Sequence, residues 1–168
     1  MLKAELGESV SLTVLESVDV VYLVRFPAYR VMTLSMEVGS RRPAYCTAMG
    51  RALLGELPEA EARRILDASD LQAHTPRTII DKQALMEEFR KARQLGYATI
   101  DQVFAPGMTA MAAPVQRRNY PAIGVISIAG PAVRLDEKRM KNLGPALLAA
   151  AFELAAASNA SPLFNRGR

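Results

Sequence analysis

Apolar and polar residues alternate along the first part of the chain in a pattern that is typical of half-buried strands. Val10, Leu12 and Val14 alternate with Ser11 and Thr13, as expected where one face of a strand packs on a core. Residues 18–26 are rich in β-branched and aromatic side chains, and residues 29–36 alternate again. The gaps between these segments are short enough for hairpin turns, so we predict three antiparallel strands.

Helical signals follow in the next part of the chain. One helix is predicted over residues 47–57, and Pro58 occupies the first position of a second helix that continues to residue 66. A third helix begins near Asp81 and ends at Gly96, a residue type that commonly caps helix C-termini. Residues 72–78 between them are expected to form an ordered loop.

The remainder of the chain again gives strands and then a helix. Strands are predicted over residues 97–103, 108–115 and 122–129, separated by breaks that contain proline. The last helix begins near Asp136 and carries an apolar stripe at a spacing of seven residues, formed by Met140, Leu147 and Leu154. This order predicts an α+β fold with about six antiparallel strands and helices on both faces, which suggests a GAF/PAS-like ligand-binding domain.

Composition narrows the class of protein. A length of 168 residues suits one domain, and the single cysteine, Cys46, cannot form an internal disulfide, which favours a cytoplasmic location. No apolar run is long enough for a membrane span, and the first residues lack a signal-peptide core. The net charge is +4, but the basic residues are scattered rather than gathered in a stripe. The charge therefore favours an anionic small ligand over DNA binding by this segment.

Residues 43–54 form the most informative segment of the sequence. Small side chains precede a helix, and they leave backbone N–H groups open to a ligand at its N-terminus. Thr47 is placed to cap that helix, and neighbouring N–H groups remain available to a carboxylate. We expect an anion to bind at residues 47–50, with Arg41 and Arg42 raising its local concentration. For both arginines a purely solvated role is the simpler alternative.

Four segments together resemble the effector-binding domain of IclR-type bacterial transcriptional regulators. In chain order they are Gly50-Arg51-Ala52-Leu53-Leu54-Gly55, with Gly55 in place of the usual alanine; Thr75-Pro76-Arg77-Thr78-Ile79; the run Arg93-Gln94-Leu95-Gly96-Tyr97-Ala98 with Asp101-Gln102, Gly107 and Ala112-Ala113-Pro114-Val115; and Ile126-Ser127-Ile128-Ala129-Gly130-Pro131.

The resemblance implies a non-enzymatic domain that senses a small organic acid and needs no cofactor or metal. In that family the domain follows a winged helix-turn-helix that binds DNA as part of a homodimer or homotetramer. Residues 1–8 then correspond to the end of a connecting helix, residues 9–158 to the effector-binding domain, and residues 159–168 to a flexible tail. DNA would be bound only through the winged helix-turn-helix, and no membrane partner is implied.

The resemblance also implies a pocket. By position it contains Ala48, Met49, Asp101, Ala110, Ser127 and Ala129, and the surrounding residues add Thr47, Gly50 and Met108. Sensors of small acids in this family often carry cysteine or serine at the position of Ala110 and a second serine at that of Ala129. Two alanines make the pocket more apolar, which favours an aromatic acid over a short keto acid.

Simpler interpretations exist for several of these residues. Met49 and Met108 fit equally as core residues, Asp101 as a surface carboxylate and Ser127 as a structural hydroxyl. Cys46 and His74 do not make a convincing catalytic pair, because nucleophilic catalysis needs a base in reach and a third orienting group. The alternative functions are a small hydrolase or transferase that uses Cys46, Asp101 or Ser127, and a purely structural oligomerisation module.

Overall fold

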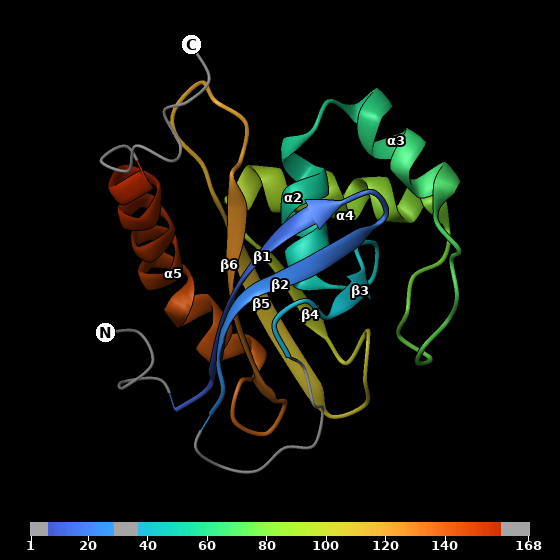
Figure 1. Cartoon of the computed structure of the whole chain (residues 1–168). Helices are drawn as coiled ribbons and strands as arrows, with labels where there is room; N and C mark the ends of the chain where they lie inside the picture. Colours follow the sequence, from blue (N-terminus) through green and yellow to red (C-terminus); the bar gives the residue numbers. More distant parts are fainter. Residues whose placement is uncertain (1–6, 29–36, 159–168) are drawn as a thin grey trace.

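One six-stranded sheet organises the molecule in a computed structural model that describes residues 7–28 and 37–158 (Figure 1). The strands are β1 (Ser9–Glu16), β2 (Asp19–Phe26), β3 (Arg41–Pro43), β4 (Ala98–Asp101), β5 (Met108–Val115) and β6 (Gly124–Pro131). Their order across the sheet is β3-β2-β1-β6-β5-β4, and every neighbouring pair is antiparallel. The two strand groups predicted from sequence therefore meet at the β1–β6 pair, and the predicted fold class is confirmed.

Four helices accompany the sheet in the described residues: α2 (Ala48–Glu56), α3 (Glu59–Ala68), α4 (Lys82–Leu95) and α5 (Glu137–Ser158). Their ends follow the local signals. The Asp81 side chain accepts a hydrogen bond of 2.8 Å from the Ala84 amide at the start of α4, and Gly96 ends that helix with φ 80°. Pro58 is the N-cap of α3 rather than its first residue.

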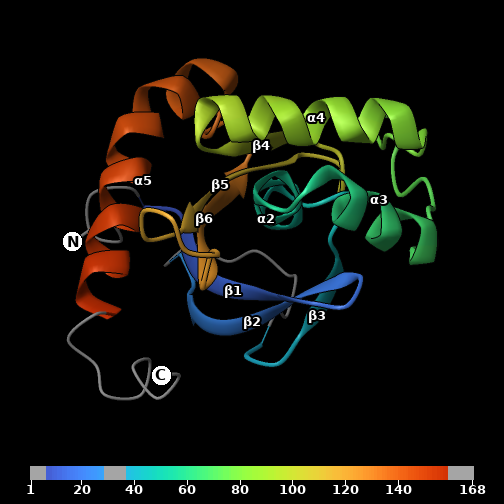
Figure 2. The ribbon, with the colours of Figure 1, turned by 90° about the horizontal axis from the view of Figure 1, so that it is seen from above.

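Helices cover both faces of the sheet, as predicted. Figure 2 shows α2 inside the curve of the sheet with α4 beside it, and α5 on the opposite side. Successive side chains of β5 point to opposite faces of the sheet and contribute to two hydrophobic cores. Ala110 and Ala112 belong to the core around α2, whereas Met111 and Ala113 belong to the core around α5. The sheet is therefore buried on both sides where β5 and β6 pass through it.

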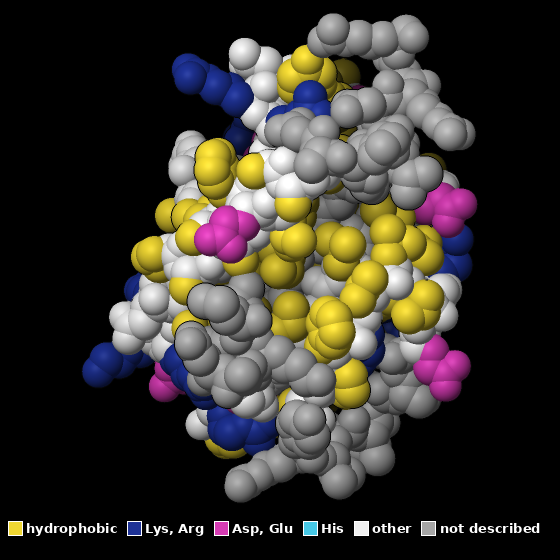
Figure 3. All heavy atoms as spheres, turned by 60° about the vertical axis from the view of Figure 1, so that its left-hand side comes forward, with side chains coloured by type: hydrophobic (Ala, Val, Ile, Leu, Met, Phe, Trp, Pro, Cys, Tyr) yellow, Lys and Arg dark blue, Asp and Glu magenta, His cyan; other side chains and the backbone are white. Residues whose placement is uncertain are grey.

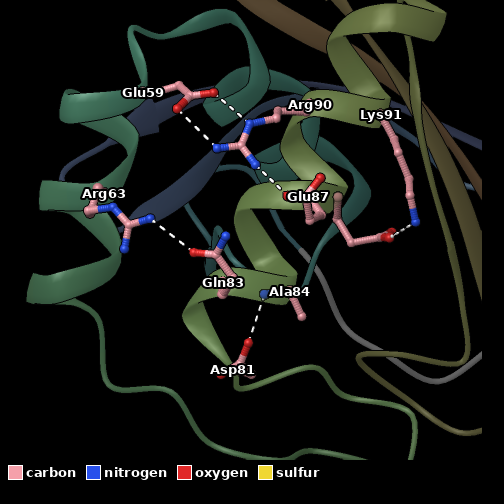
Figure 4. Close-up of polar contacts among 9 residues, drawn as sticks. Glu59, Arg63, Asp81, Gln83, Ala84, Glu87, Arg90 and Lys91 are labelled. Atoms are coloured by element: carbon pink, nitrogen blue, oxygen red, sulfur yellow. Dashed lines mark hydrogen bonds and ion pairs between the residues drawn. The ribbon is translucent and has the colours of Figure 1, made fainter.

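Exposed ion pairs add to the contact between α3 and α4 (Figure 4). Arg90 of α4 reaches Glu59 of α3 at 2.6 Å and Glu87 of its own helix at 2.6 Å. Such exposed pairs contribute roughly 0–1 kcal/mol each. The helix pair therefore depends mainly on buried side chains, among them Leu66 and Phe89, which are at most 2% exposed.

The face shown in Figure 3 carries a broad group of hydrophobic side chains. On the β1–β2 hairpin, Leu12 pairs with Val24 and Val14 pairs with Val21. Three large apolar side chains of β2, Leu23, Val24 and Phe26, are 45%, 38% and 49% exposed. This hairpin therefore exposes apolar surface that the described helices do not bury.

Some predicted segments differ from the structure or lie outside it. The strand predicted over residues 29–36, the tail predicted over residues 159–168 and the first six residues of the linker remnant predicted over residues 1–8 lie outside the described residues. The third described strand is instead β3, which pairs with the start of β2. β4 ends at Asp101, two residues earlier than predicted, because Gln102 takes a left-handed conformation with φ 55° and starts a turn.

Glu8 joins the beginning of β1 to the segment that leads into α5. Its carboxylate is 1% exposed and accepts two hydrogen bonds of 3.0 Å from the Arg134 guanidinium. Arg139 Nη1 lies 3.4 Å from the same carboxylate. Gly130 makes room for this group, because a Cβ there would lie 2.3 Å from a carboxylate oxygen of Glu8.

Candidate functional site

The turn before α2 is fixed by two residues of the helix itself. Gly50 packs against the backbone of Ala44 so closely that a Cβ would lie 2.0 Å from the Ala44 carbonyl oxygen. Arg51 is 3% exposed, and its Nε donates to the Tyr45 carbonyl oxygen at 3.1 Å while Nη1 contacts Glu88 at 3.4 Å. These two motif residues therefore hold the small-residue turn in place rather than face a ligand.

The N-terminus of α2 is capped as expected from the sequence. Thr47 Oγ1 accepts a hydrogen bond of 3.1 Å from the Gly50 amide. The amides of Ala48 and Met49 occupy the first turn, where helix N–H groups lack intrahelical acceptors and the helix dipole is positive. This end of α2 is thus suited to a negatively charged group.

A cavity of about 60 Å³ adjoins this helix end. Its walls come from α2, the sheet and the turn between β4 and β5, and they are mostly apolar. The lining residues are Tyr22, Arg42, Thr47, Ala48, Met49, Ile100, Phe104, Ala105, Met108, Thr109, Ala110 and Ala129. The cavity therefore presents the helix N-terminus and one arginine to an otherwise apolar space.

Arg42 is the cation of this cavity. Its Nε is buried without a hydrogen-bond partner, whereas Nη1 donates to the Arg41 carbonyl oxygen at 2.9 Å. The guanidinium carbon lies 5.6 Å from the centroid of the Phe104 ring. Arg41 turns the other way and pairs with Glu16 and Asp19 at 2.5 and 3.2 Å. The structure thus distinguishes two neighbouring arginines that the sequence left equivalent.

Tyr22 of β2 contributes its hydroxyl-bearing side chain to the cavity wall. It is 4% exposed, and burial raises the pKa of this hydroxyl above its usual value, with Arg25 and Arg42 acting in the opposite direction. Sequence reasoning did not single out Tyr22, Ile100 or Phe104. The alternation of β2 places Tyr22 on the same face as buried Val20, and this signal was available in the sequence.

Six of the nine residues predicted for the site line the cavity: Thr47, Ala48, Met49, Met108, Ala110 and Ala129. Gly50, Asp101 and Ser127 are not in its lining. Asp101 is a partly exposed end residue of β4 and pairs with Arg77, while its neighbour Ile100 points inward. Ser127 is 3% exposed and lies further along β6, opposite Ser11 and Ala112.

Cys46 and His74 do not form a reactive pair. The Cys46 side chain is fully buried, and burial raises the pKa of its thiol to about 12, so the thiolate is scarce at neutral pH. The nitrogen Nε2 of His74 lies 3.2 Å from the Tyr45 hydroxyl. Within residues 7–28 and 37–158, no group of three or more side chains is arranged to hold a metal ion.

An antiparallel α+β sheet with a small cavity at a helix N-terminus defines a GAF/PAS-like ligand-binding domain. The model of the family "Bacterial transcriptional regulator IclR C-terminal" matches residues 1–156, and the chain belongs to this family. It is the C-terminal effector-binding domain of an IclR-type regulator. No helix among the described residues is long and apolar enough to cross a membrane.

Individual relatives agree with this assignment. The "Probable transcriptional regulator SauR" of Cupriavidus necator is 35% identical over 150 residues, which cover 89% of this chain and 60% of that protein. The C-terminal domain of the Escherichia coli transcriptional regulator KdgR has a TM-score of 0.82 at 28% identity, over 92% of this chain and 90% of that one.

A third relative was solved with a ligand. The inducer-binding domain of the PobR transcription factor from Acinetobacter, a double mutant in complex with 3-hydroxybenzoic acid, has a TM-score of 0.84 at 26% identity. The match covers 92% of this chain and 91% of that one.

Proposed function

We propose that this effector-binding domain recognises a small organic acid, with an aromatic acid favoured, in the cavity between α2 and the sheet. Binding would control the DNA affinity of a winged helix-turn-helix domain in a longer protein. The domain would act as a sensor in the cytoplasm and carry out no reaction on its ligand.

The observation that carries this proposal is that the Nε atom of Arg42 is buried without a hydrogen-bond partner. A buried guanidinium nitrogen without a partner costs free energy, and a carboxylate that accepts its hydrogen bond removes that cost. Thr47, Ala48 and Met49 at the N-terminus of α2 line the same cavity, and a helix N-terminus favours the same charge. In this proposal the carboxylate lies between Arg42 and the α2 N-terminus.

The apolar walls support an aromatic rather than a short acid. Ala110 and Ala129 offer methyl groups, and Met49 and Met108 offer adaptable thioether side chains. The related PobR domain in complex with 3-hydroxybenzoic acid supports the same ligand class.

Thermal unfolding with benzoate and with benzamide tests the proposal. A ligand at about 100 times its dissociation constant stabilises a protein by roughly 2.7 kcal/mol. We expect benzoate to raise the melting temperature more than benzamide does, and Arg42→Gln to remove this difference. Arg41→Gln is the matched control, because Arg41 points away from the cavity to Glu16 and Asp19. Equal stabilisation by acid and amide would contradict the proposed role of Arg42.

The domain forms a homodimer or homotetramer, for which the exposed apolar side chains of the β1–β2 hairpin offer a contact surface. Light scattering on the purified domain measures the oligomeric state directly.

The bound acid remains unchanged, so mass spectrometry should recover it intact after prolonged incubation, whereas a hydrolase or transferase would consume it.

A further inference from the structure

The cavity is too small for the ligand class proposed above. It measures about 60 Å³, whereas an engineered apolar cavity of about 150 Å³ in a protein core binds one benzene molecule. Full enclosure of an aromatic acid in this cavity therefore requires part of the wall to move. The identity of that part decides which acids the domain accepts.

Most of the wall cannot move far. Ala48, Ala110 and Ala129 have no rotatable side-chain bonds, and Tyr22 and Ile100 are packed in the core at 4% and 7% exposure. The large apolar wall residues that also reach the surface are Phe104 and Met108, at the turn between β4 and β5.

The backbone before Phe104 is fixed from outside the cavity. Thr75 Oγ1 donates to the Gln102 carbonyl oxygen at 2.7 Å, and Thr78 Oγ1 donates to the Val103 carbonyl oxygen at 2.7 Å. The Phe104 ring, by contrast, is positioned by packing and by two neighbouring side chains. Arg42 lies 5.6 Å from its centroid on the cavity wall, and the His74 ring lies 5.1 Å away. The ring can therefore rotate while these hydrogen bonds of the turn stay intact.

We propose that Phe104 is the gate of the cavity and sets the largest acid that the domain accepts. This inference rests on the proposed function, because it assumes that an acid occupies this cavity. A carboxylate that binds Arg42 weakens the contact of that guanidinium with the Phe104 ring, and the ring then swings aside to admit one aromatic ring. His74 limits how far the ring moves, so acids with two fused rings are excluded.

Calorimetric titration of the full chain with benzoate and 2-naphthoate tests the gate. We expect the wild type to bind benzoate and to bind 2-naphthoate at least about tenfold more weakly. We compare the ratio of the dissociation constants for 2-naphthoate and benzoate. Phe104→Ala should change this ratio by about tenfold or more in favour of 2-naphthoate. His74→Ala, which leaves the cavity lining unchanged, should shift it in the same direction by less.

Tyr120→Ala is the matched control. Tyr120 is also a partly exposed aromatic residue beside an arginine, since Arg117 lies 4.4 Å from its ring, but it belongs to the β5–β6 connection and not to the cavity. In Tyr120→Ala the ratio of the two dissociation constants should stay at the wild-type value. If Phe104→Ala fails to fold, the milder change Phe104→Leu takes its place in the test. Phe104→Leu should also shift the ratio toward 2-naphthoate.

The possible failures are distinguishable. If the wild type binds benzoate but the Phe104 variants keep the wild-type ratio, the gate is wrong and the proposed function stands. If the wild type binds 2-naphthoate as tightly as benzoate, the size limit itself is absent and the gate is again wrong. If no acid binds to any variant, the proposed function fails together with the gate. An unchanged ratio in His74→Ala would overturn the restraining role of His74.

Discussion

At the scale of single residues, small side chains create the space for a ligand. Ala110 and Ala129 face each other across the β5–β6 pair, and both line the cavity. Their methyl groups leave room that larger side chains would fill.

Ala129→Leu should therefore abolish stabilisation by benzoate. The added side chain is larger than the space available to it, because the cavity is only about 60 Å³. Thermal unfolding with and without benzoate measures the effect, and circular dichroism checks that the fold is retained. Ala156→Leu, at an exposed position of α5, should respond to benzoate like the wild type. Wild-type affinity in Ala129→Leu would rule out this cavity as the binding site.

Cys46 illustrates how burial controls the chemistry of a single group. Its thiol is shielded from solvent and has a pKa of about 12, against a usual value of 9.0. The folded protein therefore retains the thiol proton between these values while the unfolded chain releases it, so this residue makes stability fall as pH rises above about 9.

Two measurements check this expectation. At pH 8 the native protein should react with a thiol reagent far more slowly than the urea-unfolded protein. Between pH 9 and 12 the free energy of unfolding should fall more steeply for the wild type than for Cys46→Ala. Rapid labelling of the native protein would show that Cys46 is accessible and would reopen the enzymatic alternative.

At the scale of elements, α2 depends on its fit to the turn that precedes it. Glycine inside a helix usually destabilises it by roughly 0.5–1 kcal/mol relative to alanine. Gly50 should behave in the opposite way, because its Cβ position is occupied by the Ala44 backbone.

Gly50→Ala is accordingly expected to destabilise the domain by about 1–3 kcal/mol or more, as overpacking does in other cores. Urea unfolding measures the change in free energy, and the loss should be accompanied by weaker binding of benzoate because the α2 N-terminus shifts. A variant as stable as the wild type would mean that the turn and the helix are not in the close contact described.

At the scale of the whole molecule, Glu8 ties the start of the sheet to the segment before α5, across 126 residues of sequence. The pair with Arg134 is unequal, since the carboxylate is 1% exposed and the arginine side chain 40%. Solvent screening on the arginine side reduces the contribution of this ion pair to the stability of the fold below that of a fully buried pair.

Glu8→Gln should nevertheless destabilise the domain by about 1–3 kcal/mol, because it weakens charge-assisted hydrogen bonds to a buried group. A double-mutant cycle with Arg134→Gln isolates the coupling by urea unfolding. The exposed Glu137–Lys141 pair, with side chains 80% and 70% exposed, is the matched control and should show a coupling near zero. Equal couplings in the two cycles would argue against a structural role for Glu8.

The sequence by itself determined most of the local structure. Alternation placed the main strands, and the caps at Thr47, Asp81 and Gly96 placed helix ends, because these signals depend on neighbouring residues alone. Resemblance over four segments indicated the family and four of the cavity residues, and the residues around them added Thr47 and Met108.

Only the tertiary structure decided which charged and aromatic groups face the ligand space. The pairing of β3 with β2 turns Arg42 inward and Arg41 outward, and the same alternation in β4 turns Asp101 to solvent. Phe104 reaches the cavity because Thr75 and Thr78, more than 20 residues away in sequence, hold the turn before it. Such contacts join distant parts of the chain, and no local pattern of residues encodes them.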